Sequence, residues 1–221
     1  MTVVTIPFFQ AELEAIYGVR APAVEDFLVD RAGARAAAGE PRAPEALLVR
    51  ESEEGLELGL FLAEDVLFAA RAADPHDRRP LLTAPEVLPR LACAAEGVSH
   101  FVYLATRAAA GRSVSLLELE VQAEVDTWAL LVLHLWRRGH RGASRALRRR
   151  LFERVGYHPH LGPDELQRYR LANRLAGGYA RWLEARYVDD ADADGLMREL
   201  RQSYRMGGAE KLGYLGARAL S

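Results

Sequence analysis

Cysteine is almost absent from this chain of 221 residues, because Cys93 is the only one. A single thiol excludes an internal disulfide and any zinc site built from several thiolates. We expect Cys93 to pack as a small apolar side chain within a helix. A catalytic thiol is the alternative, since His100 follows seven residues later, two helical turns along roughly the same face.

Lysine is equally scarce, since Lys211 is the only lysine among 29 basic residues. Together with the abundance of Ala, Leu and Gly, this bias suggests a GC-rich bacterial genome. An arginine in this chain is therefore weaker evidence for recognition of a carboxylate or a phosphate than it is in most proteins.

Long hydrophobic runs are missing as well. No run reaches the roughly 18–20 apolar residues that a membrane span needs, and residues 129–136 are interrupted by His134. The first residues lack the charged region and the apolar stretch of a secretory signal. We therefore expect a cytoplasmic protein with no membrane association.

The familiar motifs of nucleotide binding and hydrolysis are absent too. The chain contains no Walker A sequence, no Gly-x-Gly-x-x-Gly after a strand, no Gly-x-Ser-x-Gly and no His-Glu-x-x-His. Whether the protein is an enzyme is therefore left open by its motifs.

Two strong helices stand out among the features that are present, at 84–110 and 116–138. Each begins with a capping-box sequence, in which Thr83 or Ser115 is followed three residues later by Glu. Gly111 lies at the expected position just after the first helix. So short a connection predicts that the two helices are antiparallel neighbours.

Together with weaker patterns elsewhere, these helices predict a mostly α fold. Its body resembles a helical bundle and carries one small β-hairpin near the N-terminus, so the fold class is α+β by strict count. Runs 46–50 and 56–61 flank an acidic tip and predict the hairpin. We expect an N-terminal segment at 1–72, a helical core at 73–206 and a loose tail at 207–221, or a single compact domain. Further helices are predicted at 8–17, 22–32, 64–72, 144–155, 163–187 and 195–206, with a linker at 33–44.

Carboxylates and a histidine recur at helical spacing on the two strong helices. Glu96 and His100 are four residues apart on the first, and Glu120 and Glu124 are four apart on the second. Inward carboxylates and imidazoles between helices are the ligands of iron, manganese or zinc. The spacing differs from the Glu-x-x-His pattern of ferritin-like proteins. His134 is a possible fifth ligand, but it lies about 15 Å along the helix from Glu124 and would need a different partner.

A structural interpretation of the same residues is open. The acidic side chains of the second helix suit its solvent-facing side, and early acids suit its positive N-terminal end. His100 is then a buried, hydrogen-bonded residue in a polar seam. The polar residues concerned are Glu118, Glu120, Gln122, Glu124 and Asp126.

Residues 137–154 form a basic segment with eight arginines and one acid, whereas residues 1–70 carry a net charge of −8. Arg145, Arg148 and Arg149 lie opposite a predicted apolar stripe of Leu147, Leu151 and Val155. This surface suits an acidic partner. It also suits a phosphate backbone, although no nucleic-acid-binding motif accompanies it. The simplest alternative is that it neutralises acidic segments of the same chain or of a second copy.

Three functions follow from these patterns. The first is an accessory subunit or adaptor that associates with a protein partner or with itself through oppositely charged surfaces, with Arg145, Arg148 and Arg149 as partner-binding residues. The second is a metal-dependent enzyme or metal-binding protein that uses Glu96, His100, Glu120 and Glu124. The third is a non-specific nucleic-acid binder.

Overall fold

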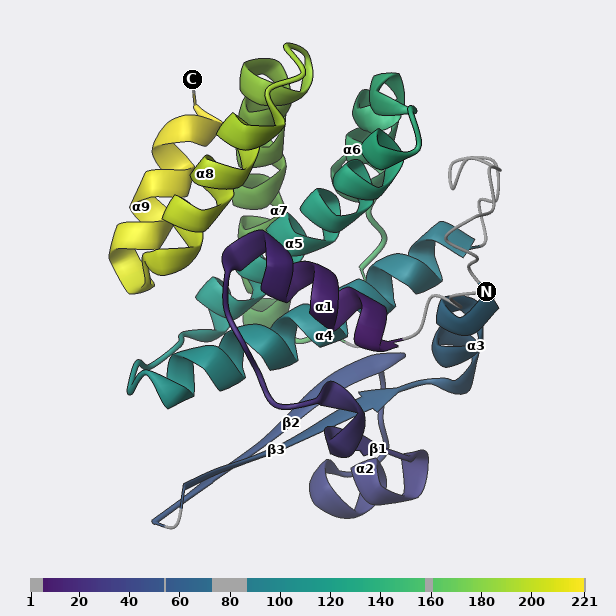
Figure 1. Cartoon of the computed structure of the whole chain (residues 1–221). Coiled ribbons are helices and arrows are strands. Elements are labelled where there is room, and N and C mark those ends of the chain that lie inside the picture. Colours follow the sequence, from purple (N-terminus) through teal and green to yellow (C-terminus); the bar gives the residue numbers. More distant parts are fainter. Residues whose placement is uncertain (1–5, 54, 73–86, 158–160, 221) are drawn as a thin grey trace. The chain divides into compact units, whose positions relative to one another are not determined.

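The computed structural model describes residues 6–53, 55–72, 87–157 and 161–220 (Figure 1). Within these ranges the chain forms nine α-helices and one three-stranded sheet, so the predicted mostly α fold with a small β element is confirmed. Two compact units are present: Met1–Glu14 with Val19–Ser113, and Ala15–Gly18 with Val114–Ser221. We call them unit 1 and unit 2. The division after residue 72 that the sequence suggests, with a single compact domain as its alternative, stays a prediction.

The sheet of unit 1 contains the predicted hairpin, in which β2 (Glu45–Ser52) pairs antiparallel with β3 (Gly55–Leu62). A third strand, β1 (Leu28–Val29), pairs parallel with β3. It was not expected, because residues 22–32 were predicted as a helix and form only a 3₁₀ turn, η1 (Val24–Phe27), before this strand. A strand of two residues has no periodicity, and only its pairing with the distant β3 defines it.

Four helices accompany the sheet: α1 (Ile6–Tyr17), α2 (Arg31–Ala38), α3 (Glu64–Ala72) and α4 (Val87–Ala109). The prediction of a linker at 33–44 is wrong for its first part, because residues 33–38 belong to α2. Asp30 caps this helix, since its carboxylate accepts a hydrogen bond from the backbone N–H of Gly33 at 2.7 Å. The last turn of α1, with Gly18, groups with unit 2.

Helices cover both faces of the sheet at its buried end, where alternate residues of β3 point to opposite sides. A Cβ atom on Gly97 of α4 would lie 3.2 Å from Leu60 and 3.1 Å from Leu62, so these two leucines face α4. Phe61 faces α2, whose Arg31 guanidinium carbon lies 5.5 Å from the centroid of its ring. Figure 1 shows α4 and α2 on opposite sides of the strands.

The ends of the two strong helices follow the local signals of the sequence. Gly111 adopts a positive φ of 64°, and the N–H groups of Arg112 and Gly111 donate to the carbonyls of Arg107 and Ala108. These bonds form a Schellman motif. Ser115 caps α5 (Leu116–Arg137) and accepts from the Glu118 N–H at 3.2 Å. Thr83 lies outside the described residues, and antiparallel packing of the pair stays a prediction.

Unit 2 is helical in its described residues, with α5 and α7 in contact at its centre and α6 and α9 packed on both. Trp128 of α5 and Tyr179 of α7 are among its fully buried side chains. A π-helical turn, η4 (Glu184–Val188), continues α7. The remaining helices are α6 (Ser144–Phe152), α7 (Pro163–Leu183), α8 (Ala193–Arg205) and α9 (Gly208–Ala219), with a 3₁₀ turn η3 (Arg141–Ala143) before α6.

Two expectations about unit 2 are wrong. Residues 208–219 form α9, although glycines suggested a loose tail, because Lys211 and Leu215 are buried on its inner face. The sequence also predicts a buried apolar stripe on α6. Leu147 is buried as predicted, but Val155 is exposed because the helix ends at Phe152. None of the helices in the described residues combines the length and the apolar composition needed to cross a membrane.

Candidate functional site

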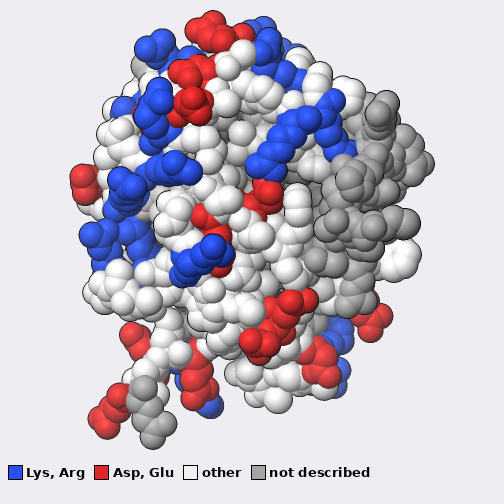
Figure 2. Space-filling view, in the orientation of Figure 1, with Lys and Arg blue, Asp and Glu red and all other residues white. Residues whose placement is uncertain are grey.

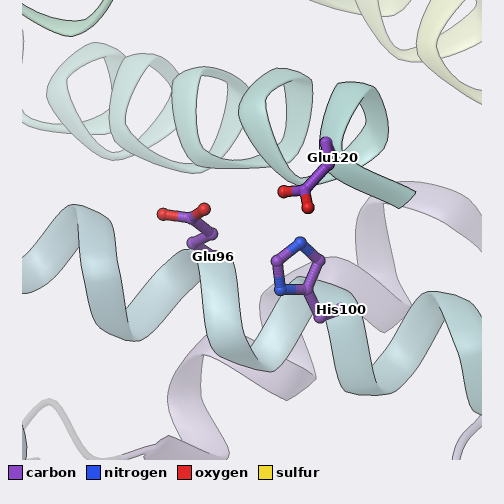
Figure 3. A group of neighbouring side chains, drawn as sticks. All are labelled: Glu96, His100 and Glu120. Atoms are coloured by element: carbon purple, nitrogen blue, oxygen red, sulfur yellow. The ribbon is translucent and has the colours of Figure 1, made fainter. Parts of the chain in front are cut away.

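Glu96 and His100 project from successive turns of α4 on the same side of the helix (Figure 3). The His100 side chain is buried, and its Nδ1 lies 3.2 Å from Oε1 of Glu45, the first residue of β2. Gly97 permits this approach, since a Cβ atom there would lie only 2.7 Å from Cγ of Glu45. Glu45 was not a candidate in the sequence, because only the packing of the hairpin on α4 brings it to the histidine.

The contact with Glu45 defines the chemistry of the imidazole. In a neutral imidazole, Nδ1 carries the proton that it donates to the Glu45 carboxylate, so Nε2 is the basic nitrogen with a free electron pair. A carboxylate that orients a histidine in this way is the common outer partner of a metal-binding imidazole. The arrangement can therefore present a fixed basic nitrogen beside the Glu96 carboxylate.

Cys93 lies one turn before Glu96, and the pKa of its thiol shows that this part of α4 is surrounded by negative charge. Burial raises the pKa of its thiol well above the ordinary range, and the negative charges of Glu96, Glu45 and Asp65 raise it further. The thiol therefore stays protonated at neutral pH, which argues against a catalytic cysteine. The same charges make the surroundings favourable for a cation.

Glu120 and Glu124, the other two predicted metal ligands, belong to α5 of unit 2 (Figure 3 draws Glu120 on that helix). Glu120 is buried, and its Oε1 lies 3.6 Å from Nε of Arg168 on α7. Glu124 is half-buried, and its charge adds to the effect of burial in raising the pKa of Tyr157. A centre made from all four predicted residues stays a prediction.

The acidic residues of α5 do not form a solvated face. Most of them are buried, and several have partners on other helices of unit 2. Glu118, for example, accepts a hydrogen bond at 2.9 Å from the backbone N–H of Gly208, the first residue of α9. The buried polar residues of this helix include Glu118, Glu120, Gln122 and Asp126.

Four of the buried side chains form what we call the α5 polar network: Tyr17, Gln122, Asp126 and Lys211. Lys211 donates to Oε1 of Gln122, whose amide donates to Oδ1 of Asp126 at 2.5 Å. Tyr17 donates to the same carboxylate oxygen. The network joins α9 and the last turn of α1 to α5, and its burial indicates a structural role.

His134 is separate from these groups. Burial, together with the smaller effect of the positive charges of Arg138 and Arg137, lowers its pKa to about 4. The imidazole is therefore neutral near pH 7. The adjacent arginines also make this end of α5 unfavourable for a bound cation.

The arginines predicted to bind a partner differ in their surroundings. Arg145 forms an ion pair with Asp189 at 2.7 Å on an exposed surface. Arg148 is 12% exposed and pairs at 3.0 Å with Glu184, which is 4% exposed. Arg149 is exposed. Two of the three arginines therefore have acidic partners in η4 or at the residue just after it.

No family model, curated protein or solved structure matches this chain. The functional assignment therefore depends on the residues and their geometry.

Proposed function

We propose that this protein binds a divalent transition metal, iron, manganese or zinc, through His100 and Glu96 of α4. The observation that carries the proposal is the buried contact between His100 Nδ1 and Glu45, at 3.2 Å. A histidine that binds a metal through one ring nitrogen usually donates the other N–H to a carboxylate or carbonyl group, which fixes the orientation of the ring.

The charge around α4 supports the same proposal. Glu45, Glu96 and Asp65 together raise the pKa of the Cys93 thiol, so a cation near them is stabilised. Imidazole and carboxylate ligands suit iron, manganese and zinc. The sequence predicts Glu120 and Glu124 as additional ligands. A metal held in this way supplies a Lewis acid and an activated water molecule.

The first experiment is elemental analysis of the protein purified without a histidine tag or chelator. We expect about one equivalent of metal in the wild type, and loss of that metal in His100→Ala and in Glu96→Gln. His140→Ala is the matched control, because His140 lies beyond α5 before η3, and it should keep its metal. Circular dichroism verifies that each variant is folded.

Glu45→Gln separates a ligand from a positioning residue. Because the change leaves the ligands in place, we expect full stoichiometry at saturating metal and an affinity lower by about 10–100-fold. Protein that is metal-free as purified, and stays so after reconstitution with Fe²⁺, Mn²⁺ and Zn²⁺, contradicts the proposal.

Association with an acidic partner is the second candidate, and the exposed side chains of Arg149 and Arg154 favour it. We expect Arg149→Glu with Arg154→Glu to weaken association, and salt to weaken it in the wild type. Arg148 stays unchanged in this test because it forms an ion pair with the buried Glu184. Affinity for DNA or RNA that falls steeply with salt is the result that favours the nucleic-acid alternative. A cytoplasmic location remains our prediction for each of these functions.

A further inference from the structure

Unit 2 has an open surface cavity of about 620 Å³ at the C-terminal half of α8 and the start of α9, and most of the side chains around it are exposed. This volume is large enough for a small molecule. Because the cavity is open and lined mainly by polar residues, a ligand is held there chiefly by charge and hydrogen bonds. The residues that line it are Arg198, Arg201, Gln202, Arg205, Met206 and Glu210.

The spacing of residues on α8 explains why arginines surround the cavity. Arg198, Arg201 and Arg205 are separated by three and four residues, so they lie on one face of the helix. Leu196 and Leu200 are fully buried on the other face. Because arginine is the usual basic residue of this chain, the significant observation is that three of them line one cavity.

Arg201 is held in place before any ligand binds. Its Nε donates to the carbonyl of Ile16 at 2.7 Å, and its Nη2 donates to the carbonyl of Ala15 at 3.1 Å. Both carbonyls belong to the last turn of α1, which groups with unit 2. A side chain fixed in this way loses little conformational freedom when it contacts a ligand.

The charges on the wall of the cavity are unequal. Three guanidinium groups oppose one carboxylate, Glu210, among the residues that line it. Figure 2 shows basic side chains gathered over the part of the molecule where Figure 1 draws α8 and α9. Such a wall attracts anions, and planar guanidinium groups bind phosphate oxygens in pairs.

We propose that this cavity binds a small organic phosphate, with the phosphate on Arg198, Arg201 and Arg205. Glu210 then accepts a hydrogen bond from a hydroxyl or amino group on the organic part of the ligand. None of the residues that line the cavity is a proposed metal ligand, so the two proposals can be tested separately.

Isothermal titration calorimetry at constant ionic strength tests the proposal with three probes: inorganic phosphate, glycerol 3-phosphate and adenosine monophosphate. We expect at least one to bind the wild type with Kd below about 1 mM. Arg198→Gln with Arg205→Gln should weaken it by about tenfold or more for each guanidinium removed. Both side chains are exposed, so the variant should fold.

The control is Arg149→Gln with Arg154→Gln, which removes the same charge from exposed residues outside the cavity. It should bind the probe as the wild type does. Two results overturn the proposal: no binding of any probe, or equal weakening in the control and the cavity variant. A single-stranded oligonucleotide that binds through Arg198 and Arg205 more tightly than every small probe also overturns it, in favour of nucleic acid.

Discussion

Tyr17, in the last turn of α1, donates its hydroxyl group to Oδ1 of Asp126 on α5, although the two residues are 109 positions apart in the sequence. Burial raises the pKa of Tyr17 well above its usual value, and the charge of Asp126 raises it further, so the phenol stays protonated. Its ring stacks on Tyr204 with a centroid distance of 3.9 Å. One side chain of α1 thus has both a polar and an aromatic partner in unit 2.

Removal of the Tyr17 hydroxyl group should destabilise unit 2. We expect Tyr17→Phe to lower the free energy of unfolding by about 1–3 kcal/mol, because a buried carboxylate loses a donor. Urea denaturation measures this change, and Tyr157→Phe is the control, with a half-buried ring outside the α5 polar network. In a double-mutant cycle with Asp126→Asn, additive effects would show that the two residues are not coupled.

Gly97 should resist substitution although it lies within a helix. Alanine is favoured over glycine by about 1 kcal/mol in a helix interior. A Cβ at position 97 would, however, lie 2.7 Å from Glu45 Cγ, so we expect Gly97→Ala to destabilise the protein. Gly213→Ala in α9 is the matched control, since a Cβ there has nothing within 4 Å, and it should stabilise the protein. A melting temperature raised equally by both substitutions contradicts the packing of α4 on β2.

His134 should make the protein less stable in mild acid. Its pKa in the folded state is about 4, whereas the unfolded value is about 6.5. Below pH 6.5 the unfolded state therefore binds the proton more strongly, and the contribution of His134 is progressively lost as the pH falls to about 4. Urea denaturation between pH 4 and 8 measures this decline. In His134→Gln the decline over this interval should be smaller, and an unchanged profile argues against a depressed pKa.

Arg148 and Arg149 are adjacent in sequence, but their substitution should have different effects. Arg148→Ala leaves the buried Glu184 carboxylate without its ion-pair partner, and we expect a loss of about 3 kcal/mol in the free energy of unfolding. Arg149→Ala removes an exposed side chain and should change stability by less than about 0.5 kcal/mol. Equal effects would mean that the Arg148–Glu184 pair does not stabilise unit 2.

The sequence by itself determined the features whose energies are local. The Ser115 cap, the Schellman motif at Gly111 and the alternation of the hairpin each depend on residues close together along the chain. Such signals predicted most helices and the mostly α fold correctly. They also placed Glu96 and His100 on one face of one helix.

Tertiary structure decided which of these side chains have partners. One interpretation of the sequence placed the acids of α5 on a solvated face. Asp126 is instead buried, and Tyr17 and Gln122 donate hydrogen bonds to its carboxylate. Glu45 meets His100 across 55 positions, and Arg148 meets Glu184 across 36. A periodic pattern reports the face of a helix on which a charge lies. Only the fold determines whether that face meets water or a distant donor, because the cost of burying a charge depends on that partner.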